Sequence, residues 1–300
     1  MSVQYMNAAK VANTKHTNEA VLLVKCPDKP GIVAVLSEFL HTFDANIIES
    51  SQYSTDPADG TFFIRLAYYC DQLGEKAEQM EKNFEGIARA FDMTYAFHYQ
   101  AQKKRAAIFV SKEPHCLLEL LWEYQTGDLP MEIALVVSNY ENSREMVEAL
   151  GIPFYYIPAN KDIRAEVEAR QIELMKEFDV DVLILARYMQ ILTPDFVSHF
   201  ENRIINIHHS FLPAFIGADP YARAFARGVK LIGATSHYVT NDLDEGPIIE
   251  QDVERVDHRV DVKELRKIGS KIERRVLVKA VKWHLENRII VEGNKTIVFQ

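Results

Sequence analysis

Three polar side chains in this sequence have the types and spacing needed for acyl chemistry. Asn206 and His208 close the apolar segment 203–208, and Asp244 lies in the polar turn 240–246. Because side chains alternate faces along an extended chain, Asn206 and His208 project to the same side. An amide and an imidazole can stabilise a developing oxyanion, and a carboxylate can orient the imidazole or position a water. The pattern favours a catalytic site.

Each feature also has a purely structural interpretation. A single histidine after an apolar strand is more often a core residue with a satisfied hydrogen bond. The turn 240–246 alone fits a solvated hairpin in which Gly246 provides a positive φ. Asn206 beside His208 favours catalysis, because a substrate-facing crevice satisfies two polar groups on one strand face more readily than a core does.

A metal site is a further alternative, built from His208, His209, His237 and Asp244. His208 and His209 are expected to face opposite ways along a strand, and the sequence contains no H-E-x-x-H motif. We therefore expect no metal.

The elements that must position these residues fall into two groups. The first hundred residues predict the order βαββαβ, a ferredoxin-like α+β unit with both helices on one face of the sheet. Its strands are expected at 20–26, 46–53, 61–69 and 93–98, and its helices at 32–43 and 74–89.

A polar segment, 100–105, then marks a boundary, after which strands alternate with helices. This alternation of strands and helices predicts a mostly parallel sheet, in which ligands bind at the carboxyl ends of the strands. Strands are expected at 106–110, 132–137, 154–157, 180–186 and 203–208, with helices at 115–124, 143–150 and 163–177. Two longer strands at 230–240 and 247–255, a helix at 262–286 and a strand pair at 289–291 and 296–299 complete the chain.

Composition narrows the function classes. The 300 residues are 48% hydrophobic and 26% charged, with a formal net charge of −9, so no broad basic surface for nucleic acid is expected. No apolar run reaches the roughly 18 to 20 residues that span a bilayer, and the start of the chain lacks the order of a secretory signal. We expect a cytoplasmic protein acting on a small molecule. Cys26, Cys70 and Cys116 are expected to be buried and unpaired.

The stretches 182–192, 206–213 and 233–246 resemble the three signature stretches of the folate-dependent formyltransferase family. The N-terminal unit, with Asp28-Lys-Pro-Gly31 and Asp44-Ala-Asn46-Ile47, resembles an ACT domain. The resemblance implies an α/β chain in which a ferredoxin-like ACT domain at 19–100 precedes a Rossmann-like formyltransferase domain at 105–300.

The resemblance also implies roles for individual residues. Asn206, His208 and Asp244 are expected to act on the formyl group of 10-formyltetrahydrofolate, and the loop 217–221 to lie beside that group. The implied folate-binding residues, several of them through the backbone, are Arg187, Tyr188, Met189, Gln190, Ile191, Leu192, His209, Thr240, Asn241, Asp242 and Leu243.

The acceptor of the formyl group is suggested by a departure from the family. Members that formylate a phosphorylated acceptor carry a glycine-rich loop after the first strand of this domain, where backbone N–H groups cradle the phosphate. Here residues 106–124 contain no glycine, and Glu113 would repel a phosphate. Water is the expected acceptor, which gives tetrahydrofolate and formate, the latter for purine biosynthesis. Transfer to an amine acceptor is the alternative.

No cofactor is expected beyond the folate substrate. The ACT resemblance implies a homo-oligomer and a possible amino-acid effector at Asp28, Gly31, Asn46 and Ile47; a unit that only builds the oligomer is equally compatible with these residues. A folate or amino-acid sensor without catalysis is disfavoured, because Asn206, His208 and Asp244 are all present.

Overall fold

The computed structural model describes residues 17–56, 58–159, 163–213 and 220–300. The chain divides into two compact units, one of Met1–Lys103 with Ile297–Gln300 and one of Lys104–Thr296.

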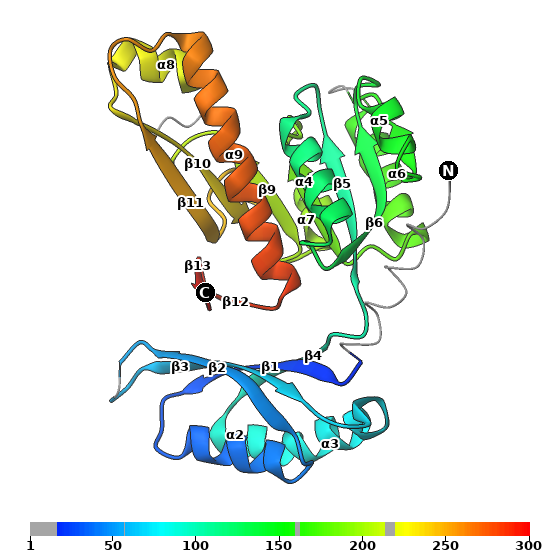
Figure 1. Cartoon of the computed structure of the whole chain (residues 1–300), viewed down its shortest axis with the longest axis vertical. Coiled ribbons are helices and arrows are strands. Elements are labelled where there is room, and N and C mark those ends of the chain that lie inside the picture. Colours follow the sequence, from blue (N-terminus) through cyan, green and yellow to red (C-terminus); the bar gives the residue numbers. More distant parts are fainter. Residues whose placement is uncertain (1–16, 57, 160–162, 214–219) are drawn as a thin grey trace, which may run out of the picture. The chain divides into compact units, whose positions relative to one another are not determined.

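The first unit is a four-stranded antiparallel sheet with two helices on one face (Figure 1). The strand order β2-β3-β1-β4 places the first and third strands at the centre. The predicted βαββαβ order and ferredoxin-like fold are confirmed. The elements are β1 (Glu19–Pro27), α2 (Ile32–His41), β2 (Asn46–Ser54), β3 (Thr61–Tyr69), α3 (Leu73–Phe91) and β4 (Thr94–Tyr99).

The core of this unit lies between the sheet and its helices. Leu22 of β1, Leu36 of α2 and Phe84 of α3 are fully buried in it. The ring of Phe84 packs edge-on against Phe39 with centroids 4.9 Å apart, which adds to the burial of both rings.

The second unit contains a seven-stranded sheet of order β11-β10-β9-β8-β5-β6-β7. The strands from β9 to β7 are parallel, whereas β10 and β11 are antiparallel to their neighbours, so the predicted mostly parallel sheet is confirmed. The strands are β5 (Lys104–Val110), β6 (Met131–Ser138), β7 (Phe154–Tyr156), β8 (Val182–Ala186), β9 (Ile204–His208), β10 (Leu231–Tyr238) and β11 (Ile248–Arg255).

Helices cover both faces of this sheet. On one face, Phe109 of β5 and Leu185 of β8 join a buried cluster with Leu174 and Phe196, which belong to two of the helices. On the other face, the long C-terminal helix packs on β10 and β11 (Figure 1). The helices are α4 (His115–Thr126), α5 (Arg144–Glu148), α6 (Arg164–Glu177), α7 (Pro194–Ser198), α8 (Pro220–Arg227) and α9 (Val262–Leu285), and a two-stranded pair follows, β12 (Ile289–Glu292) and β13 (Lys295–Val298).

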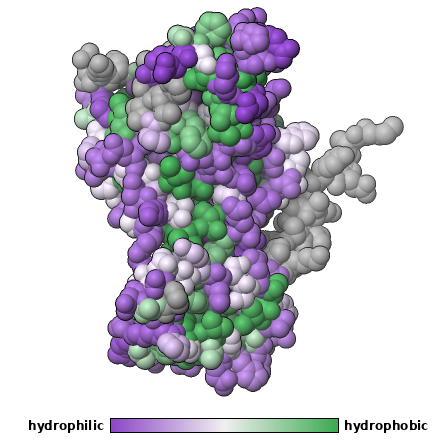
Figure 2. All heavy atoms as spheres, turned by 90° about the vertical axis from the view of Figure 1, so that its left-hand side faces the viewer, coloured by the Kyte–Doolittle hydropathy of each residue, from purple (hydrophilic) through white to green (hydrophobic). Residues whose placement is uncertain are grey.

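The described surface in Figure 2 is largely hydrophilic, and the cysteines lie in the interior. Figure 2 shows hydrophobic residues gathered in groups among hydrophilic ones on this face. Among the described helices, none combines the length and the apolar character that crossing a membrane requires. Cys26, Cys70 and Cys116 are buried and free, as predicted. Burial raises the pKa of Cys26 to about 11.

Candidate active site

The three predicted catalytic side chains come together at the carboxyl end of β9. His208 Nδ1 lies 3.3 Å from Asp244 Oδ1, which reaches the strand from the turn after β10. The side chains of His208 and Asp244 are 8% and 13% exposed. Asn206, two residues earlier on β9, pairs with His237 of β10 in the antiparallel register. The alternation of strand side chains thus brings distant residues to one point.

His237 links Asn206 to Asp244 and was not predicted as part of the catalytic group. Its Nδ1 donates to the carbonyl of Tyr238 (2.9 Å), because a carbonyl can only accept. Burial lowers the pKa of His237, so the ring is neutral and its Nε2 is an acceptor. The Asn206 amide therefore donates to His237 Nε2 (3.2 Å), which fixes which way the amide group points. His237 Nε2 also lies 3.8 Å from Asp244 Oδ1.

Asp244 carries a negative charge in this site. Burial raises the pKa of its carboxyl, but the hydrogen bond from His208 and the electrostatic effect of that ring outweigh it, so the pKa lies below its ordinary value. On the other side of the imidazole, His208 Nε2 is buried and has no hydrogen-bond partner among the described residues. An imidazole held by Asp244 with a free buried Nε2 is suited to contact a substrate oxygen.

The turn that carries Asp244 differs from the hairpin of the purely structural alternative. The positive φ falls on Asp244 (φ 59), not on Gly246. Gly246 is required for a different reason, because a Cβ there would lie 1.8 Å from the carbonyl oxygen of Tyr238. The backbone N–H of Tyr238 donates to the carbonyl of the next residue, Pro247 (2.9 Å), which holds the turn against β10.

His209 also departs from expectation. Because β9 ends at His208, strand alternation does not extend to His209, and the two rings stack with centroids 5.2 Å apart. Burial and the charge of Arg187 lower the pKa of His209 to about 4, so the ring is neutral near pH 7.

The predicted folate-binding loop after β8 contains both exposed and buried side chains. Met189 and Ile191 are 57% and 59% exposed, and Gln190 is partly exposed. Tyr188 is instead buried, where Gln171 donates to its hydroxyl (2.9 Å), and Leu192 packs on the core.

The second predicted folate-binding segment leads into the catalytic turn. Thr240 is partly buried and its hydroxyl donates to the carbonyl of Asp242 (3.3 Å). Asn241, Asp242 and Leu243 are exposed, Leu243 by 57%. Of the predicted loop 217–221, residues 217–219 lie outside the described residues.

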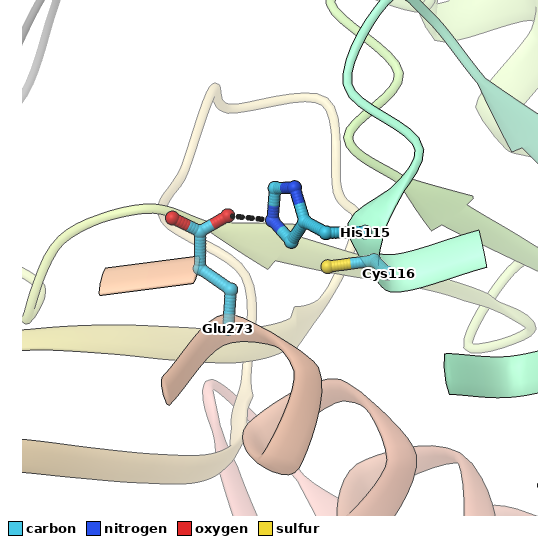
Figure 3. A group of neighbouring side chains, drawn as sticks. All are labelled: His115, Cys116 and Glu273. Atoms are coloured by element: carbon cyan, nitrogen blue, oxygen red, sulfur yellow. Dashed lines mark hydrogen bonds and ion pairs between the residues drawn. The ribbon is translucent and has the colours of Figure 1, made fainter. Parts of the chain in front are cut away.

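A second cluster of polar groups is centred on Glu273 and was not predicted from the sequence. Glu273 of α9 is 2% exposed; its Oε1 accepts from the Tyr221 hydroxyl (2.6 Å) and its Oε2 from His115 Nε2 (2.8 Å; Figure 3). Arg187 Nε lies 3.4 Å from the same Oε2. Burial raises the pKa of Glu273, but His115, Arg187 and Tyr221 together lower it to about 2.

The sequence did contain a signal for this cluster. Glu273 interrupts the apolar stripe of α9, between Ile272 and Val276, where a lone carboxylate needs a partner. Gly269, one turn earlier, is a second signal, because glycine is unfavourable inside a helix. In the structure, a Cβ there would lie 1.9 Å from the Tyr221 hydroxyl.

The ligand atoms of His115, Cys116 and Glu273 lie within 4.8 Å of one another, the one such group found among the described residues (Figure 3). Both Glu273 oxygens already accept hydrogen bonds, and the guanidinium of Arg187 beside them would repel a cation. Burial raises the pKa of the Cys116 thiol well above its ordinary value, which disfavours the thiolate that binds metals. We interpret the cluster as an ion-pair network.

The predicted effector residues form two pairs in the first unit. Asp28 and Gly31 follow the end of β1, whereas Asn46 and Ile47 begin β2. Asn46 of β2 and Glu19 of β1 are both strand partners of Tyr69 in β3. Asn46 and Ile47 therefore lie at the level where β1 starts. Eight residue steps separate the two levels, about 26 Å at roughly 3.3 Å each. Within one chain, these four residues do not form a single site.

Comparisons with known proteins agree with the geometry. The formyl transferase family model matches residues 104–281. A formyltetrahydrofolate deformylase of Bacillus subtilis is 65% identical over 278 residues, which cover 93% of each chain. The structure of a formyltetrahydrofolate deformylase from Pseudomonas syringae superposes with a TM-score of 0.91 at 42% identity, covering 97% of this chain and 98% of that one.

A solved transferase matches a smaller share of the chain. The glycinamide ribonucleotide transformylase 1 of Symbiobacterium toebii aligns with a TM-score of 0.63 at 30% identity, over 68% of this chain and 97% of that one. The deformylases, in contrast, extend across both units. The chain therefore belongs to the formyltetrahydrofolate deformylase family.

Proposed function

We propose that this chain hydrolyses 10-formyltetrahydrofolate to tetrahydrofolate and formate. The observation that carries the proposal is the convergence of Asn206, His208 and Asp244 in a buried site where His208 Nε2 has no partner among the described residues. The names of the relatives support the substrate.

The geometry divides the chemistry among these side chains. Water attacks the formyl carbon, and negative charge develops on the formyl oxygen. The amide of Asn206 has a second N–H besides the one donated to His237, and it is directed to this oxygen. His208 donates to the same oxygen through Nε2, the ring nitrogen that no described residue engages. Donors held in place before the reaction stabilise the tetrahedral intermediate without reorganisation.

Asp244 serves both the imidazole and the water. Its Oδ1 accepts from His208 Nδ1, which holds the ring with Nε2 toward the substrate. Its Oδ2 receives no hydrogen bond from a described residue and accepts the proton of the attacking water. The C–N10 bond then breaks, N10 takes a proton, and formate leaves as an anion. The residues require no cofactor for these steps.

Two exposed segments hold the folate. Backbone groups of residues 187–192 and 240–244 bind the pterin, with Met189, Ile191 and Leu243 as apolar walls, because exposed apolar side chains beside a catalytic group are typical of a ligand pocket. The ring of His209 stacks on that of His208 and narrows the site beside it.

The loop after β5 supports water as the acceptor. Ser111 donates to Asn139 Oδ1 (2.8 Å) and accepts from the backbone N–H of Met189 (3.0 Å), so its hydroxyl is engaged with protein groups. Glu113 is exposed in the same loop and would repel a phosphate. An acceptor carrying a phosphate is therefore disfavoured.

The experiment that tests the function is incubation with 10-formyltetrahydrofolate in the absence of any amine. We expect formate and tetrahydrofolate in equal amounts, at a rate proportional to enzyme. Formate release at the buffer rate until an amine is added would instead establish the transferase alternative.

For the first unit, we propose an ACT-type role in a homo-oligomer that acts in the cytoplasm and contributes formate to purine biosynthesis. Gly31 begins α2 with φ 94, and the free N–H groups of a helix start can hold the carboxylate of an amino-acid effector. Because the two pairs of effector residues lie far apart in one chain, such a site requires a second copy.

A further inference from the structure

Arg187 places a permanent positive charge beside the catalytic residues, and the mechanism above does not use it. Arg187 directly follows β8, with φ 64 in the left-handed region. Since Leu185 pairs with Asn206 across β8 and β9, Arg187 lies next to the end of β9 that carries His208. Its side chain is only 12% exposed. A strained backbone and a buried charge at one residue are together typical of a functional position.

The guanidinium of Arg187 has hydrogen-bond donors that no described residue uses. Nε and Nη1 are both buried and have no hydrogen-bond partner among the described residues. Glu273 Oε2 lies 3.4 Å from Nε as an ion-pair partner, but no hydrogen bond joins the two atoms. Buried donors are normally satisfied, so donors held free in this way indicate an acceptor that arrives with a ligand.

A second unpartnered group lies at the same end of the sheet. His208 Nε2 is also buried without a hydrogen-bond partner among the described residues, and the ring of His209 stacks on His208. Arg187 lies close enough to His209 for its charge to act on that ring. Among the described residues, Arg187 and His208 thus leave unpartnered nitrogen atoms at the same end of two neighbouring strands.

We propose that the guanidinium of Arg187 is a subsite for the formate product. Hydrolysis forms a bond between the water oxygen and the formyl carbon and breaks the C–N10 bond; one proton goes to N10 and one is released. The formyl group of the substrate is neutral, whereas formate is a planar anion with two acceptor oxygens. A guanidinium matches such a carboxylate through paired N–H donors. The subsite therefore favours product over substrate.

This inference rests on the proposed hydrolysis and makes formate an inhibitor of the enzyme. The test measures the inhibition constant of sodium formate in the amine-free assay, with sodium chloride keeping the ionic strength constant. We compare the wild type with Arg187→Met, with Arg187→Lys, and with Arg170→Met as a control, since Arg170 is an exposed arginine that pairs with Glu173 on α6.

We expect Arg187→Met to raise the formate inhibition constant at least about tenfold, the effect of losing a charge-assisted hydrogen bond. Arg187→Lys keeps the charge without the paired donors and is expected to fall between Arg187→Met and the wild type. Arg170→Met is expected to match the wild type. An unchanged inhibition constant in Arg187→Met would overturn the proposal.

A double variant separates formate binding from the neutralisation of Glu273. Arg187→Met leaves the Glu273 charge without its arginine, whereas Arg187→Met/Glu273→Gln removes both charges. We expect the double variant to recover thermal stability relative to Arg187→Met while keeping the weakened formate inhibition. Recovery of wild-type formate inhibition in the double variant would show that Arg187 only balances Glu273.

Failure of the subsite and failure of the function give different results. If the wild type releases no formate from the substrate, the hydrolysis is wrong. If it hydrolyses the substrate but formate does not inhibit it, only the subsite is wrong. Binding of isotopically labelled formate, followed by NMR line broadening in the wild type and in Arg187→Met, tests the subsite without turnover; equal broadening in both would overturn it.

Discussion

Asp244 and His208 form a pair in which each side chain needs the other. The carboxylate keeps its charge through the imidazole beside it, and the imidazole is oriented through Nδ1. We expect Asp244→Asn and His208→Ala each to abolish measurable turnover, because the first removes the proton acceptor and the second a donor to the oxyanion. Single-turnover formate release and binding of tetrahydrofolate measure the two effects separately.

Folate binding is expected to persist in both variants, since the pterin is held by other segments. Asp257→Asn and His258→Ala are suitable controls, because they make similar changes at the surface. Wild-type turnover in Asp244→Asn or in His208→Ala would remove that residue from the catalytic group.

Glu273 gives a prediction about stability and pH. Its folded pKa of about 2 lies below its ordinary value of 4.5, so the unfolded chain binds the proton more tightly. The stabilisation, on the order of 3 kcal/mol, is fully present above pH 4.5 and is lost as the pH falls toward 2. Glu273→Gln should therefore be less stable than the wild type near neutral pH, by an amount that shrinks below pH 4.5.

Urea unfolding at a series of pH values measures this difference. Glu201→Gln, an exposed substitution, controls for the general effect of removing a carboxylate. A difference in unfolding free energy between wild type and Glu273→Gln that stays constant with pH would contradict the assigned ionisation.

At the scale of elements, the turn after β10 positions Asp244 through a backbone contact. Gly246→Ala would force a Cβ into the carbonyl of Tyr238, so the turn must move away from β10. A displacement of about 1 Å at a catalytic group can reduce the rate about a hundredfold, and we expect a fall in kcat of that order. Gly86→Ala on α3 is the control, because a Cβ there meets nothing within 4 Å. Wild-type kcat in Gly246→Ala would show that the contact does not position Asp244.

Some of these elements could be predicted from sequence and others could not. Strand β9 was predictable because alternation and apolar content coincide at residues 204–208, and the same alternation located Asn206 and His208. The helices α7 and α8 were missed because five and eight residues give too few turns for a periodic signal.

The contacts around the site were the part that sequence could not give. His237 meets Asn206 only through the register of β10 on β9, and Arg187 meets Glu273 only through the packing of α9. The purely structural alternative gave Gly246 a positive φ, because turns commonly use glycine for that purpose. In the structure, a close approach to Tyr238 is what excludes a side chain at Gly246.

At the scale of the whole molecule, the order of the two units was predictable from the change of rhythm near residue 100, since each unit has its own strand and helix pattern. Assembly is a different matter, because nothing in one chain specifies its copy number. The separation of the two pairs of effector residues does, however, constrain how an effector site is built.

If an effector binds between copies, one chain supplies the loop with Gly31 and the other supplies the start of β2 with Asn46. Gly31→Val and Asn46→Ala, each alone, should then abolish effector binding. A pair that contains one chain of each variant has two sites between its chains. One site contains both substitutions, so the other contains neither and should bind the effector. Isothermal titration with glycine and with methionine measures this, after the chains are mixed, unfolded and refolded together. Binding that does not return in the mixture, or that persists in the single variants, would place the effector elsewhere. If neither amino acid produces a binding signal with the wild type, a unit that only builds the oligomer is favoured.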